Sequence, residues 1–180
     1  MNEGFGSIRH LAARFFGALD PRGPSAALEA WAQGFLLAGE RELWMQMSGP
    51  DRRHAAGVAR KVASLLNDGG PAPDRTVMAA ALLHDVGKLR CGLGTFSRVA
   101  VTLAAMSLGR ERLAEIPPEH RRWRARVGEY LTHDRIGEEM LSRAGSAALT
   151  STWAGEHHRN RQSWVTPPRI AAALNEADGD

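Results

Sequence analysis

His84 and Asp85 are adjacent in the chain, and together they could bind a divalent metal ion. An alanine- and leucine-rich run over residues 79–83 comes directly before them. An imidazole nitrogen and a carboxylate oxygen are a donor pair that suits divalent transition metals. Neighbouring side chains on a helix point about 100° apart, so a metal held between these two must lie near a helix end.

Further potential ligands occur on both sides of this pair. Five of the seven histidines and two aspartates belong to the series His54, His84, Asp85, His133, His157, His158 and Asp178. Each member falls on a different expected helix or at a helix end. Helical bundles build metal sites in this way, with side chains from facing helices directed inward.

This series resembles the HD-domain superfamily of metal-dependent phosphohydrolases. The resemblance covers roughly residues 40–180, and the matching segments are 53–59, 84–88, His133 with Gly137, 156–158 and 176–178. The fuller ligand set is similar to the dinuclear branch that includes the HD-GYP cyclic-dinucleotide phosphodiesterases. The Gly-Tyr-Pro signature is missing, because residues 159–164 read Arg-Asn-Arg-Gln-Ser-Trp. Lys88-Leu89 stands where the (p)ppGpp-hydrolase branch carries Glu-Asp, and Pro50 stands where some trinuclear members carry Glu.

The resemblance implies a ligand set for two metal ions. The first ion would be bound by His54, His84, Asp85 and Asp178, and the second by His133, His157 and His158, with Asp85 bridging the two. The ions would be Mn, Fe, Ni, Co or Zn, and the nucleophile would be a water molecule that they activate. His157 and His158 can both ligate only where a helix ends; otherwise one of them contacts substrate. Asp134 and Asp180 are near alternatives, but the register of the helices favours Asp85 and Asp178 as the ligands. Glu156 is a candidate to fix an imidazole tautomer.

Positive charge could recognise a phosphorylated substrate. Lys88 lies three residues after Asp85, and the resemblance places its ammonium on a substrate phosphate; the alternative is an interaction with the helix dipole. We therefore predict Asp85 and Lys88 as catalytic residues. A cluster of arginines is either a substrate-binding rim or a solvated helix face: Arg121, Arg122, Arg124 and Arg126.

The pattern of the whole chain predicts an all-α fold, a single-domain HD-type helical bundle. Residues 1–47 would form N-terminal helices packed on the core, and 48–180 the metal-binding domain. We expect helices at 7–19, 26–37, 40–47, 48–66, 75–86, 132–141, 146–156 and from 167–168 to 178, with a lid-like connection in 90–128. Ser25, Ser48, Asp74 and Thr132 are expected caps, and Gly87 is expected to end the 75–86 helix.

Composition limits the class of protein. The 180 residues are 43% hydrophobic and 24% charged, with a net charge of +3, which is typical of a soluble globular protein. The single Cys91 and the absence of a signal sequence favour a cytoplasmic protein, and the apolar run 99–106 is too short to span a bilayer. No aromatic interleaving accompanies the arginines, so a nucleic-acid module is not expected. The sequence does not determine the oligomeric state.

These features favour a metal-dependent phosphohydrolase acting on a phosphomonoester or phosphodiester of a small nucleotide-like substrate. Three alternatives stay open: a cyclic-dinucleotide phosphodiesterase, a non-catalytic signalling or binding module of the same fold, and a di-iron oxygenase. The missing Gly-Tyr-Pro argues against the first, and the complete ligand series argues against the second. Ligands for di-iron and di-manganese look alike, so residue types do not exclude the third.

Overall fold

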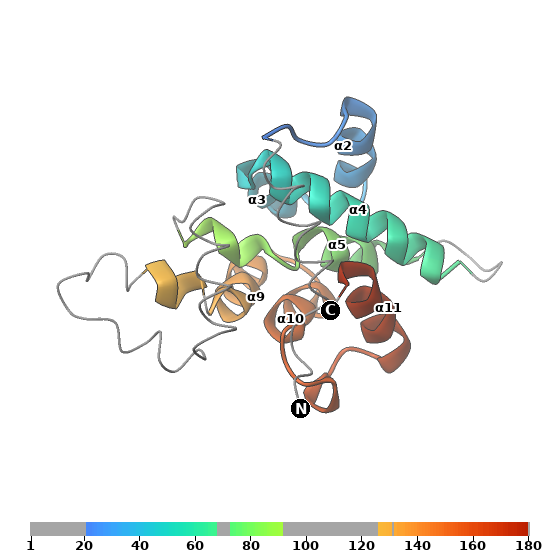
Figure 1. Cartoon of the computed structure of the whole chain (residues 1–180), viewed down its shortest axis with the longest axis vertical. Coiled ribbons are helices and arrows are strands. Elements are labelled where there is room, and N and C mark those ends of the chain that lie inside the picture. Colours follow the sequence, from blue (N-terminus) through green and yellow to red (C-terminus); the bar gives the residue numbers. More distant parts are fainter. Residues whose placement is uncertain (1–20, 68–72, 92–125, 131, 180) are drawn as a thin grey trace.

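The computed structural model describes residues 21–67, 73–91, 126–130 and 132–179, and all regular secondary structure in these ranges is helical (Figure 1). This confirms the predicted all-α fold. The elements are α2 (Ala26–Gln33), α3 (Ala38–Gln46), α4 (Gly49–Leu65), α5 (Arg75–Leu83), the 3₁₀ turn η1 (Val86–Leu89), α9 (His133–Arg143), α10 (Ala148–Glu156), the 3₁₀ turn η3 (Arg161–Ser163) and α11 (Pro168–Asp178).

Helix α5 lies at the centre of the fold because almost its whole surface is apolar. Every residue from 77 to 83 is buried. Helices α4 and α10 pack against α5, while α11 packs against α4, and α9 packs against α10 and η1 (Figure 1). Burial of the Leu82 and Leu83 side chains contributes roughly 1.5–3 kcal/mol each. The Ala/Leu-rich run that precedes His84 is therefore the core element that holds the pair in place.

Side-chain caps set the beginnings of three helices as predicted. Ser25, Ser48 and Asp74 each accept a hydrogen bond from a backbone N–H two or three residues later. Thr132 does precede α9, but the prediction that its side chain caps the helix is wrong. Its hydroxyl instead donates to the Gly128 carbonyl oxygen at 2.8 Å.

Two predicted helices end earlier than expected. The helix predicted over 26–37 stops at Gln33, because Gly34 caps it and the chain turns before α3 begins. The helix predicted over 75–86 stops at Leu83, with His84 as its C-cap. Asp85 then leads into η1 instead of continuing the α-helix.

The N-terminal helices α2 and α3 pack on α4, α5 and η1. Trp44 of α3 is fully buried and donates its indole N–H to Glu29 Oε1 of α2 at 2.5 Å. Glu29 also pairs with Arg52 of α4, so a single carboxylate joins the three helices. The division into 1–47 and 48–180 stays a prediction. The predicted helix 7–19 and most of the predicted connection 90–128 lie outside the described residues.

Most of the candidate ligands lie near the C-terminus of α5. No helix in the described ranges has both the length and the apolar character needed to cross a membrane.

Candidate metal centre

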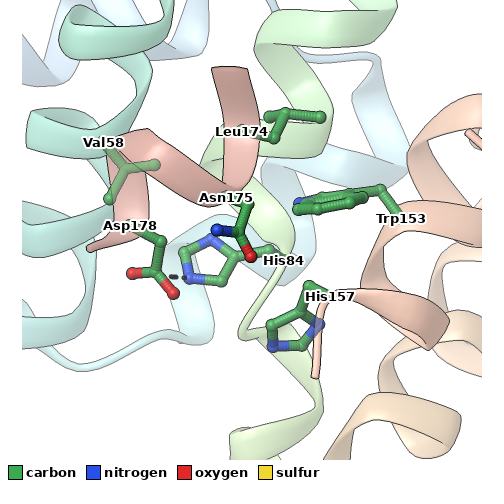
Figure 2. Close-up of a pocket in the computed structure, with 7 residues that line it drawn as sticks. All are labelled: Val58, His84, Trp153, His157, Leu174, Asn175 and Asp178. Atoms are coloured by element: carbon green, nitrogen blue, oxygen red, sulfur yellow. Dashed lines mark ion pairs between the residues drawn. The ribbon is translucent and has the colours of Figure 1, made fainter. Parts of the chain in front are cut away.

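All seven predicted metal ligands converge at the C-terminal end of α5. His54 lies on α4, and His84 and Asp85 lie at the break between α5 and η1. His133 begins α9, His157 and His158 follow α10, and Asp178 ends α11. Figure 2 shows part of this arrangement, with Asp178 and His157 approaching His84 from different helices. Because α5 ends at Leu83, His84 and Asp85 lie at a helix end, which is where two adjacent side chains can share a metal ion.

Asp85 is the centre of the cluster because its two oxygens face different histidines. Its Oδ1 lies 3.3 Å from His133 Nε2 and 3.7 Å from His157 Nε2. Its Oδ2 lies 3.5 Å from His84 Nε2 and also contacts the Lys88 ammonium. One carboxylate thus separates two sets of imidazole nitrogens, which is the geometry that a bridging ligand needs.

Asp178 completes the set on the His84 side. Its Oδ1 lies 2.8 Å from His54 Nε2 and 3.6 Å from His84 Nε2. The rings of His54 and His84 have their centres 5.9 Å apart, so the predicted convergence of these two histidines is observed.

Three buried histidines are held in one orientation by the backbone. Each donates its Nδ1 hydrogen to the carbonyl oxygen three residues earlier: His84 to Ala81 at 3.0 Å, His133 to Tyr130 at 2.6 Å, and His157 to Ala154 at 2.9 Å. A carbonyl can only accept, so the hydrogen of each neutral ring is on Nδ1 and the lone pair is on Nε2. All three Nε2 atoms are directed toward the Asp85 carboxylate.

The same three Nε2 atoms fit a metal better than they fit any protein group. Each is buried and has no hydrogen-bond partner among the described residues. A buried polar atom without a partner costs about 1–3 kcal/mol. Three such atoms around one carboxylate are explained if divalent cations accept their lone pairs.

The electrostatics put these groups in the protonation states that metal ligands require. Burial lowers the pKa of His84 to about 4, although Asp85 and Asp178 act in the opposite direction. Burial also lowers the pKa of His133. Burial alone would raise the pKa of Asp85, but Lys88 and then His84 hold it well below its usual value. At neutral pH, His84 and His133 are therefore neutral imidazoles and Asp85 is an ionised carboxylate.

The adjacent His157 and His158 both reach the site because α10 ends at Glu156. His157 is the C-cap of the helix, and the two ring centres are 4.0 Å apart. The His158 ring lies 5.0 Å from that of His133 and is exposed to solvent. Two groups have ligand atoms within 4.8 Å of one another: Asp85, His133, His157 and His158 in one, and His54, His84 and Asp85 in the other.

Glu156 does not fix an imidazole tautomer, contrary to the prediction. Its two carboxylate oxygens accept the backbone N–H groups of Val165 at 2.7 Å and Thr166 at 2.9 Å. Buried Glu156 therefore ties the segment after η3 back to the end of α10, just before α11 begins. The tautomers are set by backbone carbonyls instead.

The predicted substrate-binding arginines and the two alternative aspartate ligands are only partly covered by the described residues. Arg126 is helical and exposed, whereas Arg121, Arg122, Arg124 and Asp180 lie outside the described residues. Asp134 Oδ1 accepts the N–H of Arg135 at 2.8 Å, and Asp134 belongs to neither of the two metal-capable groups.

Two residues near the site were not anticipated from the sequence. The Tyr130 ring stacks on the His133 ring, with centres 5.6 Å apart, and its spacing of three residues before a ligand was the available signal. Asn175 lies one turn before Asp178 and lines a small pocket between α4, α10 and α11 (Figure 2). That pocket is on the Asp178 side of the cluster, and its apolar walls include Val58, Trp153 and Leu174.

The sequence matches the HD domain family over residues 52–174. This range contains every proposed ligand except Asp178. Neither the curated proteins nor the solved structures contain a match to the chain.

Proposed function

The chain belongs to the HD-domain family, and we propose that it is a metal-dependent phosphohydrolase that cleaves a phosphomonoester or phosphodiester bond in a nucleotide-like substrate. The family suggests metal-dependent hydrolysis in general. The choice of reaction and substrate is our inference from the residues of this site.

The observation that carries the proposal is the position of Asp85 between two groups of imidazoles. Its Oδ2 faces His84, and its Oδ1 faces His133 and His157. Two cations, when bound, would lower the pKa of a shared water molecule and neutralise the charge of the phosphoryl oxygens. We assign one cation to His54, His84, Asp85 and Asp178, and the other to Asp85, His133, His157 and His158.

The protein's own groups would orient the ions and the substrate. The Nδ1 hydrogen bonds hold the imidazoles so that their Nε2 lone pairs stay aimed at the centre. Lys88 is largely buried beside Asp85, and we assign its ammonium to a non-bridging phosphate oxygen. The imidazoles are fixed before substrate arrives, which lowers the cost of organising the site during the reaction.

A covalent mechanism has little support in the described part of the chain. Cys91 lies near the site in sequence, but it is fully buried and its Sγ contacts the Gly87 carbonyl oxygen at 3.8 Å. It lacks the exposure to solvent that a nucleophilic thiol requires. An activated water is the simpler nucleophile for this site.

Metal analysis followed by a phosphate-release screen tests the proposal. The protein is purified, its metal content is measured, and the metal-free form is assayed with Mn²⁺, Fe²⁺, Ni²⁺ and Mg²⁺ against mononucleotides and linear and cyclic dinucleotides. Metal-dependent release that disappears in Asp85→Asn is the expected result. Tight metal binding with no hydrolysis of any phosphate ester would contradict the proposal, and oxygen consumption in its place would indicate an oxygenase.

A further inference from the structure

The two oxygens of Asp85 have different surroundings, and the difference comes from Lys88. Lys88 follows Asp85 by three residues across η1, and side chains with this spacing eclipse one another on a 3₁₀ turn. The Lys88 ammonium contacts Oδ2, and its side chain is only 12% exposed. One oxygen of the proposed bridging ligand is therefore already in contact with a cation of the protein itself.

The Oδ1 side of Asp85 is ready to receive a metal ion. The Nε2 atoms of His133 and His157 lie 3.3 and 3.7 Å from Oδ1, and neither has a hydrogen-bond partner in the described part of the chain. Both rings are already oriented by their Nδ1 bonds to the backbone. His158, an exposed residue, adds a third imidazole to this side.

The Oδ2 side is occupied by interactions that a metal ion would have to replace. His84 Nε2 is available at 3.5 Å, but Oδ2 is shared with the Lys88 ammonium. The other two donors are bonded to each other, with His54 Nε2 at 2.8 Å from Asp178 Oδ1. An ion entering here must remove an ammonium from one carboxylate and separate an imidazole from the other.

We propose that the two metal positions are unequal and that Lys88 makes them so: the position of His133, His157 and His158 fills first, and that of His54, His84 and Asp178 fills only when the ammonium leaves Asp85. The inference rests on the proposed function, which defines both positions. Lys88 is then a built-in counter-ion of Asp85. It can contact a substrate phosphate only after it has left that carboxylate.

Equilibrium binding of Mn²⁺ to the metal-free full-length chain tests the inference, with free Mn²⁺ measured from its paramagnetic resonance signal. The wild type should bind two equivalents in two classes whose dissociation constants differ by at least about tenfold, or one equivalent alone. Lys88→Met should tighten the weaker class, or create the second equivalent, by at least about tenfold. His133→Ala should remove the tighter class, and His54→Ala the weaker one.

Three further variants distinguish a local effect of the Lys88 ammonium from an effect of net charge and from a loss of folding. Arg90→Met removes the same charge from an exposed residue two positions further along the turn, and it should shift both classes alike, by less than about threefold. Lys88→Arg keeps the cation and should keep the classes apart. Lys88→Gln replaces the ammonium with a neutral polar group, so it tests the same loss of charge if Lys88→Met does not fold.

The possible failures can be distinguished. Two equal classes in the wild type overturn the inference, and so does a Lys88→Gln or Lys88→Met variant that moves both classes as Arg90→Met does. If phosphate release is normal in either case, the proposed function is unaffected. A chain that binds no Mn²⁺ and releases no phosphate with any metal overturns both proposals.

Discussion

Gly87 packs directly against the backbone of His133, so closely that a Cβ atom at position 87 would overlap the His133 carbonyl oxygen. The same Cβ would lie 2.7 Å from the backbone nitrogen of Gly137. Two glycines therefore let η1 lie against α9 without an intervening side chain. This contact sets the distance between Asp85, which precedes η1, and His133, which begins α9.

We predict that Gly87→Ala separates η1 from α9 and displaces His133 from Asp85. Because a rigid backbone group must move, the free energy of unfolding should fall by roughly 1–3 kcal/mol. Metal content should fall with it, since the Asp85 and His133 ligand atoms would no longer share an ion. Urea unfolding and metal analysis of the purified variant measure both effects.

Gly57→Ala is the matched control for this substitution. Gly57 lies on the exposed face of α4, and a Cβ there meets nothing within 4 Å. The change should stabilise the helix by about 0.5–1 kcal/mol and leave metal content unchanged. Equal stability of the Gly87→Ala and wild-type proteins would show that η1 can move without cost.

We predict that Asp85→Asn loses metal at both positions. The amide has nearly the shape of the carboxylate, but it lacks the negative charge and its nitrogen cannot serve as the second bridging donor. Metal affinity and phosphate release should each fall by more than about 100-fold. Groups that only hydrogen-bond to metal ligands contribute up to about that factor, and a direct ligand should contribute more. Asp134→Asn is the control, because that neighbouring carboxylate bonds only to local backbone in the described contacts. Wild-type metal content in Asp85→Asn would contradict a bridging role.

Residue types and helix periodicity predicted the positions of the helices, and the resemblance to the HD-domain superfamily predicted that the ligands would gather. His54, His84 and Asp178 could be placed on separate helices because their flanking residues carry clear caps and apolar faces. The end of α5 could not be predicted so well. Residues 83–86 have no helix-breaking feature of their own, and the break is explained by the packing of Gly87 on α9, which is a tertiary contact.

The orientation of the imidazoles was also beyond the sequence. Each Nδ1 bonds to a backbone carbonyl three residues earlier, and every residue type supplies such a carbonyl. Glu156 shows the opposite case, in which a conspicuous side chain next to two histidines suggested an imidazole partner. Its carboxylate is used by two backbone N–H groups of a distant segment, and local sequence carries no signal of that pairing.

We predict that the metal-free protein loses stability as the pH falls from about 6.5 toward 4. Burial lowers the pKa of His84 to about 4 in the folded protein, from 6.5 in the unfolded chain. Between these values the unfolded chain binds more protons, so acidification favours unfolding. The contribution of His84 is complete above pH 6.5 and is lost progressively down to pH 4, for a total of about 3 kcal/mol.

Urea unfolding in the presence of a chelator, at pH values from 7.5 to 4.5, measures this dependence. His84→Gln should reduce the slope by up to about 1.4 kcal/mol per pH unit. His133, whose pKa burial also lowers, should keep part of the dependence in that variant. A stability of the metal-free wild type that stays constant over this range would show that the histidines titrate normally in the folded protein.

We predict that the arginines of residues 121–126 act on substrate encounter. Arg126 is exposed, and the three others lie outside the described residues. The metals would bind any phosphate, so preference for a larger anion requires positive charge beyond them.

Changing Arg122 and Arg124 together to glutamate should raise KM and weaken the dependence of KM on salt, with kcat little changed. The reason is that the change weakens binding of the substrate and of the transition state equally. Arg60→Glu combined with Arg143→Glu, at two exposed positions on α4 and α9, is the charge-matched control and should have a smaller effect on KM. Lys88→Ala should instead lower kcat, since its ammonium is assigned to the reacting phosphoryl group. If the reversals at 122 and 124 change KM no more than the control pair does, the arginine cluster is a solvated surface and substrate preference must come from the metal centre and Lys88.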